Sequence, residues 1–152
     1  MIHSFSFPYI RFPAVPTPAF PARNFVDRPA LETRIEYQGT IFPLSFFSII
    51  DSGADSCVFP SLVGEQIGID IKTGLSEGTM GVAGSGITYY HSIKVWISIQ
   101  GNWYHFDCFA GFMDEMDQFG MGLLGHHGFF SLFDSVTLDS KKKIVELKID
   151  IP

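Results

Sequence analysis

The chain has 152 residues, the size of one compact domain, and its apolar content of 46% is enough to bury a core. Its formal net charge of -6 excludes the strongly basic nucleic-acid-binding proteins, because phosphate binding needs a basic face and the chain's basic run is the short Lys141–Lys143. No stretch of about 18 apolar residues is present to cross a membrane, so we expect no membrane partner.

Residues 1–29 form a proline-rich N-terminal arm, and residues 30–152 are predicted to form the folded domain. The arm holds six of the nine prolines, at positions 8, 13, 16, 18, 21 and 29. Proline disfavours helices and central strands, so we expect an extended segment that lies along the domain or along a partner subunit. The same prolines interrupt any signal-peptide core, which favours a cytoplasmic protein.

Short strands separated by turn residues dominate the chain from residue 31 onward. Apolar alternation and turn residues predict strands at 30–37, 42–50, 87–99, 103–112 and a closing hairpin at 135–149. A turn is expected at Gly101–Asn102, and the closing hairpin should turn near 139–142. The pattern is typical of a mostly-β barrel.

Two short helices are expected between these strands. The first covers residues 61–69, with Ser61 as N-cap and Gly68 as the stop, and the second covers residues 128–133. The two cysteines, Cys57 and Cys108, lie in apolar strand-like surroundings. Buried reduced thiols are the favoured interpretation, with a disulfide as the alternative.

A carboxylate at Asp51 follows the apolar strand that ends in Ile49 and Ile50, and Ser52-Gly53-Ala54 comes directly after it. A charge in such a place is costly unless it is hydrogen-bonded, paired or protonated. One explanation is an Asx-turn, in which the side chain of Asp51 caps its own loop. The other is a catalytic carboxylate.

The segment "GMGLLGHHGFFSLFD" provides a second signal, because Leu123 and Leu124 meet Gly125 just before a predicted helix. The order of elements is strand, Asp-Ser-Gly-Ala, apolar strand, short helix, glycine-rich hairpin, then apolar-apolar-Gly, helix and a last hairpin. In this order, residues 31–149 resemble the retropepsin-like (retroviral-type) aspartic proteases.

This resemblance implies a mostly-β, retropepsin-like acid protease barrel with one or two short helices that supplies one catalytic aspartate, Asp51. No other aspartate in the chain is followed by Ser-Gly or Thr-Gly. A symmetric homodimer is therefore expected to bring two copies of Asp51 together, which share one proton and titrate as a unit. No cofactor is implied.

The resemblance also assigns roles to the neighbours of Asp51. Ser52 would orient the loop by reaching the partner's loop, Gly53 would leave room for substrate, and Ala54 would keep the turn small. Leu123, Leu124 and Gly125 would support the loop from beneath. A flap that closes over substrate would include Gly81, Val82, Ala83, Gly84, Ser85 and Gly86.

Other polar residues invite different interpretations. His126 and His127 could suggest a metal site, but adjacent residues on a helix point apart and no third ligand is suitably spaced, so we expect no metal and a surface or interface pair. The acidic 114–117 run is expected to be a solvated turn. Asp55 is expected to be a polar partner in the loop or a dimer contact.

The predicted function is an aspartic endopeptidase that is active as a homodimer and hydrolyses extended polypeptides with the Asp51 pair. The alternative is a non-catalytic dimeric module that binds peptides or proteins on the same fold. Retroviral enzymes brace their dimer with an arginine after the apolar-apolar-Gly motif. The segment 125–128 lacks that arginine, so dimer stability is expected to come from elsewhere, either from the proline-rich arm or from residues 145–152 pairing across the two-fold axis.

Overall fold

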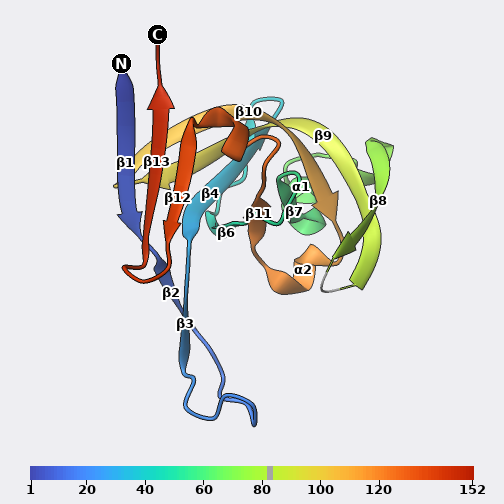
Figure 1. Ribbon diagram of the computed structural model, residues 1–152. Helices are drawn as coiled ribbons and strands as arrows, with labels where there is room; N and C mark the ends of the chain where they lie inside the picture. The colour runs from blue at the N-terminus through green and yellow to red at the C-terminus, as the bar shows by residue number, and fades with distance from the viewer. Residues whose placement is uncertain (82–83) are drawn as a thin grey trace. The chain divides into compact units, whose positions relative to one another are not determined.

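The computed structural model describes residues 1–81 and 84–152 (Figure 1). Its contacts define two compact units. The larger is Leu31–Leu132, and the smaller joins Met1–Ala30 to Phe133–Pro152. The predicted division into an arm, residues 1–29, and a protease domain, residues 30–152, stays a prediction.

The larger unit is a sheet that closes on itself. Its strands are β4 (Ala30–Tyr37), β5 (Thr40–Ile41), β6 (Phe46–Ile50), β7 (Val58–Pro60), β8 (Leu75–Gly81), β9 (Gly84–Ile99), β10 (Asn102–Met113) and β11 (Gly122–Leu124). They are ordered β5-β4-β6-β11-β7-β10-β9-β8, and a further pairing of β4 with β9, which sets Ile35 opposite Val95, closes the ring. The predicted mostly-β barrel is confirmed.

The core of this unit follows the alternation seen in the sequence. On β9, Ile93, Val95, Ile97 and Ile99 are buried. Each such side chain contributes about 1.5–3 kcal/mol when it is removed from water. The predicted turn after this strand is one residue too late: Ile99 pairs with Asn102, so Gln100 and Gly101 occupy the turn with φ of 53° and 81°. Two consecutive positive φ values fit the right-handed twist of a two-residue hairpin.

Helices are short. They are α1 (Ser61–Gln66) and α2 (Met116–Phe119), with 3₁₀ turns at Ile71–Thr73 and Phe130–Leu132. None of the helices in the described residues is long and apolar enough to span a membrane.

Two expectations for the helices are wrong. Pro60 is the N-cap of α1 and Ser61 is its buried first residue, because the rigid proline already supplies the extended backbone that precedes a helix. Gly68 does stop this helix, as expected: with φ of 92° it follows the C-cap Ile67, and its N–H donates to Glu65 O at 3.1 Å. The helix predicted at 128–133 is reduced to a single 3₁₀ turn, and part of the expected solvated turn at 114–117 is the start of α2.

The smaller unit contains β1 (Ile2–Pro8), β2 (Ile10–Pro13), β3 (Phe25–Arg28), β12 (Ser135–Asp139) and β13 (Ile144–Asp150). β1, β13 and β12 form one antiparallel sheet, and β2 pairs with β3. The N-terminal segment is thus more regular than its prolines predicted. Pro8 and Pro13 are the last residues of their strands, where a missing N–H is tolerated.

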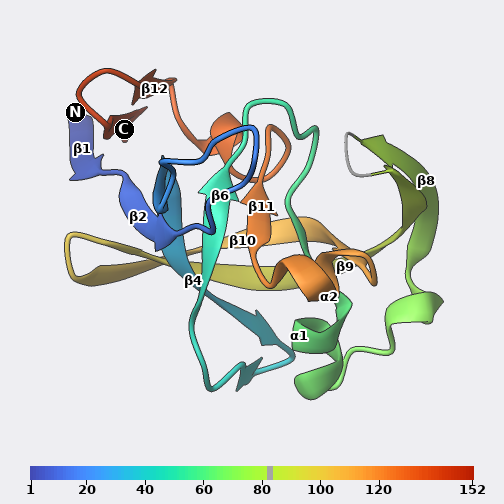
Figure 2. The same ribbon diagram turned by 90° about the horizontal axis from the view of Figure 1, so that it is seen from below.

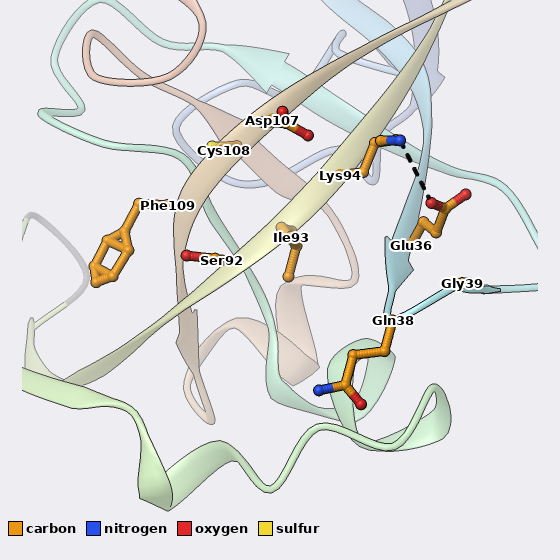
Figure 3. A pocket seen from close by; sticks show the side chains of 9 residues that line it. All are labelled: Glu36, Gln38, Gly39, Ser92, Ile93, Lys94, Asp107, Cys108 and Phe109. Atoms are coloured by element: carbon orange, nitrogen blue, oxygen red, sulfur yellow. Dashed lines mark ion pairs between the residues drawn. The ribbon is translucent and has the colours of Figure 1, made fainter.

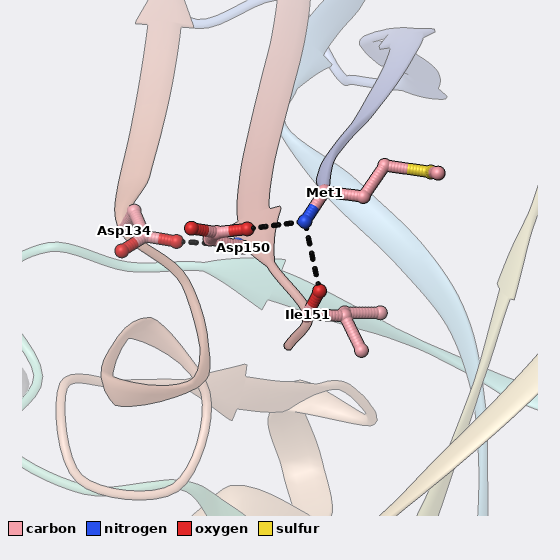
Figure 4. Close-up of polar contacts among 4 residues, drawn as sticks. All are labelled: Met1, Asp134, Asp150 and Ile151. Atoms are coloured by element: carbon pink, nitrogen blue, oxygen red, sulfur yellow. Dashed lines mark hydrogen bonds and ion pairs between the residues drawn. The ribbon is translucent and has the colours of Figure 1, made fainter.

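The closing hairpin is confirmed, with its turn between β12 and β13. Asp139 Oδ1 accepts hydrogen bonds from the backbone N–H groups of Lys141 and Lys142 at 3.1 and 2.8 Å, which fixes the turn. At the other end of this sheet, the amino group of Met1 lies 2.8 Å from Asp150 Oδ1 and donates to Ile151 O (Figure 4). Both contacts are exposed, so they contribute little to stability.

Both cysteines are buried free thiols, as expected. A Cβ added to Gly128 would lie 2.7 Å from the Sγ of Cys108 and 3.2 Å from that of Cys57, so both sulfur atoms lie close to this glycine. The hydrogen bond with Cys57, together with burial, raises the pKa of the Cys108 thiol above its ordinary value.

We predict that neither thiol reacts with an aromatic disulfide reagent in the native protein at neutral pH, because burial blocks access and the Cys108 thiol stays protonated. In denaturant both should react, and the released chromophore counts them. A native disulfide would instead leave no reactive thiol after unfolding.

Candidate active site

Asp51 lies at the end of β6, next to the end of β11. β6 delivers it, and β11 runs parallel to β6 with Leu124 beside Ile50, so the two strands lie side by side (Figure 2). The ladder continues for one more bond, from Asp51 N to Leu124 O at 3.0 Å. The backbone of Asp51 is therefore an extension of the central sheet, while its side chain is only partly buried.

The Asp51 side chain also organises its own loop. Asp51 Oδ1 accepts a hydrogen bond from the N–H of Gly53 at 2.9 Å, and Asp51 O accepts one from Ala54 N at 3.1 Å. This is the Asx-type bond considered above. It uses one oxygen of a group that offers about four acceptor positions, so capping and chemistry are compatible at this carboxylate.

Gly53 lies close to that same oxygen. A Cβ added at Gly53 would be 3.2 Å from Asp51 Oδ1, tighter than ordinary packing. The absence of a side chain at Gly53 thus keeps the space next to the carboxylate open.

Gly125 lies directly beneath the loop. A Cβ added there would collide with Ser56 O and would lie 2.6 Å from Ala54 O, both backbone atoms. The next two residues bind the same loop, since His126 N donates to Ala54 O at 2.9 Å and His127 N to Asp55 O at 2.8 Å. The apolar-apolar-Gly motif therefore lets two backbone segments touch.

His126 makes a second contact with the loop through its ring. Its Nε2 lies 2.6 Å from Ser52 O, and the ring stacks on Phe130 with centroids 4.7 Å apart. The sequence predicted that His126 and His127 form a surface or interface pair, and both side chains are exposed. The contact of the His126 ring with Ser52 was not identified from the sequence. Asp55 is also exposed.

Tyr90 joins the loop to β9. Its hydroxyl lies 3.0 Å from Ser56 Oγ, and its ring stacks on Phe109 of β10 at 5.4 Å with an interplanar angle of 11°. Neither Tyr90 nor Ser56 was identified from the sequence, because a tyrosine in an alternating strand gives no local signal of its partner.

The glycine-rich segment forms the end of the β8–β9 hairpin, where Gly81 pairs with Gly84. Val82 and Ala83, two of the predicted flap residues, lie outside the described residues. Ser85 is exposed, and Gly86 lies against the carboxylate of Glu115. Within the hairpin the hydroxyls of Thr79 and Thr88 lie 2.6 Å apart.

The predicted support residues differ in exposure. Leu124 is fully buried, whereas Leu123 is partly exposed. Leu123 pairs with Ile49 of β6 and Val58 of β7. The structure thus brings Asp51–Ala54 and Leu123–Gly125 together.

The described residues offer no group of three or more His, Cys, Asp or Glu side chains that could hold a metal ion. An open pocket of about 460 Å³ lies over β4, β9 and β10, where Lys94 forms an ion pair with Glu36 at 3.8 Å (Figure 3). Its lining does not include Asp51, so it is separate from the aspartate loop.

Comparison with known proteins gives a match in structure but not in sequence. No protein-family model and no curated protein matches the chain. A retropepsin-like aspartic protease from Rickettsia conorii aligns over 98% of this chain and 94% of its own, with a TM-score of 0.56 and 12% identity. EIAV protease complexed with the inhibitor HBY-793 aligns over 65% of this chain and 82% of its own, with a TM-score of 0.40 and 20% identity. The chain has the fold of a retropepsin-like aspartic protease.

Proposed function

We propose that the protein is an aspartic endopeptidase that acts as a homodimer on extended polypeptides. The observation that carries the proposal is the position of Asp51, whose partly buried carboxylate stands at the end of a central strand of this fold and accepts the Gly53 N–H. A carboxylate fixed in this way is oriented for acid–base chemistry.

A second copy of Asp51 completes the proposed site. The chain carries a single Asp-Ser-Gly sequence, so the second carboxylate must come from a second copy of the chain. In the symmetric dimer the two carboxylates share one proton, since two like charges a few ångströms apart do not both ionise readily. Ser52 is proposed to reach the partner's loop, and its exposed side chain leaves it free to do so.

The proposed reaction is the addition of water to a peptide carbonyl. The ionised carboxylate of the pair takes a proton from the bound water, and the protonated one donates a hydrogen bond to the carbonyl oxygen. The resulting tetrahedral intermediate collapses when the amide nitrogen is protonated and the C–N bond breaks. The pair returns to its singly protonated state.

The proposed substrate is an extended chain with bulky apolar residues at the cleaved bond. The hairpin end at residues 81–86 is proposed as the flap that covers it and offers backbone hydrogen bonds. The partly exposed Leu123, next to the strand that carries Asp51, is an apolar contact available to such a substrate.

Cleavage of casein tests the proposal. We expect peptide products at mildly acidic pH, inhibition by a transition-state mimic such as pepstatin, and a dimer in sedimentation velocity under the same conditions. Binding of casein without any cleavage would support a non-catalytic peptide-binding module instead. Cleavage by a species that stays monomeric would contradict the shared site.

A further inference from the structure

We infer that His126 is a positioning residue that orients the Ser52–Gly53 peptide so that its N–H points at the Asp51 carboxylate. The inference deepens the proposed function and rests on it for its catalytic consequence. Its structural part depends on three hydrogen bonds of the larger unit. They join the His126 ring to Ser52 O, Gly53 N to Asp51 Oδ1, and His126 N to Ala54 O.

One peptide group connects His126 to Asp51. The carbonyl of Ser52 lies 2.6 Å from His126 Nε2, and the N–H of Gly53 donates to Asp51 Oδ1 at 2.9 Å. This C=O and this N–H belong to the same planar peptide unit and point in opposite directions in a trans peptide. A contact that fixes the carbonyl therefore fixes the direction of the N–H.

The hydrogen on the imidazole follows from its acceptor. A carbonyl oxygen only accepts, so Nε2 must carry the hydrogen, as it does in one neutral tautomer and in the imidazolium. The contact therefore persists whether or not the ring is charged. Donation to the Ser52 carbonyl also polarises the peptide, which strengthens the donation from Gly53 to Asp51.

The His126 ring is itself held in place. The backbone N–H of His126 donates to Ala54 O at 2.9 Å, and the ring stacks on Phe130 with an interplanar angle of 27°. Phe130 N in turn donates to Gly125 O at 3.1 Å, so the stacking partner is fixed to the same turn. His126 thus holds the carbonyls on both sides of Gly53, one through its backbone and one through its ring.

Two substitutions separate the donor from the ring. His126→Phe keeps the stack on Phe130 and removes the donor, whereas His126→Gln keeps an N–H donor at similar reach and removes the stack. His127→Phe is the matched control, because the adjacent His127 side chain is exposed like that of His126, and His127 binds the loop through its backbone N–H. If His126→Phe does not fold, His126→Met also lacks a donor and retains an apolar contact.

Kinetics on a peptide substrate give the first readout. We expect His126→Phe to lower kcat by about 10- to 100-fold with little change in KM, because the carboxylate loses its orientation while the substrate contacts remain. His126→Gln should recover most of kcat, and His127→Phe should match the wild type. Equal losses in the Phe and Gln variants would overturn the inference, since a ring needed only for packing gives that result.

The amide proton of Gly53 gives a readout that needs no activity. In a ¹H–¹⁵N spectrum of the full chain, His126→Phe should move this resonance upfield, as expected for a weakened bond to a carboxylate, and His126→Gln should restore it. An unchanged Gly53 resonance in His126→Phe would overturn the inference even in an active enzyme. A wild type that cleaves nothing would refute the proposed function, while the Gly53 resonance would still decide the role of His126.

Discussion

Replacement of Asp51 by Asn is expected to abolish peptide cleavage and to leave the fold and the dimer intact. The substitution removes the ionisable group and keeps the shape of the side chain. Loss of general acid–base catalysis alone should lower kcat by about 1,000-fold or more. Cleavage of casein or a fluorogenic peptide measures this loss.

The fold should survive because Asn retains the acceptor that the loop uses. In the wild type Asp51 Oδ1 binds the N–H of Gly53 at 2.9 Å, and the amide oxygen of Asn can accept the same bond. Circular dichroism and sedimentation velocity should therefore match the wild type. Residual cleavage at the wild-type rate would remove Asp51 from the mechanism.

Mixed dimers provide a sharper test of the shared site. When wild-type and Asp51→Asn chains are combined in equal amounts and allowed to exchange subunits, one site per dimer leaves about one quarter of the activity of an all-wild-type sample. Independent sites on each chain would leave about one half. The two outcomes distinguish a dimeric catalyst from a dimer of complete enzymes.

Gly125→Ala is expected to destabilise the protein by about 3 kcal/mol or to prevent folding, because its Cβ has no room. The added carbon would collide with Ser56 O and would lie 2.6 Å from Ala54 O. These are backbone atoms, so relief requires the loop to move away. Such a movement would weaken the bond from His126 N to Ala54 O.

Urea unfolding at matched protein concentrations measures this effect. Gly78→Ala is the control, because a Cβ at Gly78 meets nothing within 4 Å and the residue is exposed on β8. Its free energy of unfolding should stay within about 0.5 kcal/mol of the wild type. A stable Gly125→Ala protein would mean that the loop does not pass over Gly125 in solution.

The sequence predicted most of the barrel because its signals are local. Alternation in β9 and the turn residues of the closing hairpin identified strands, and the retropepsin-like fold is confirmed. The errors are also local. Ser61 was expected to cap a helix that Pro60 caps, and the prolines of residues 1–29 concealed strands that place Pro8 and Pro13 at their ends.

The sequence by itself determined which residues are candidates for chemistry, because a carboxylate after an apolar strand, followed by Ser52 and Gly53, is visible without any contact. Only the tertiary structure decided how the candidate is held. Ser52 and His126 are 74 positions apart, and a periodic sequence pattern relates only residues that are close along the chain. The two residues meet because β6 and β11 run parallel and end together. Contacts of this kind depend on the closure of the sheet, so the fold assigned the His126 ring and Tyr90 to the aspartate loop, whereas Gly125 was already predicted to support it.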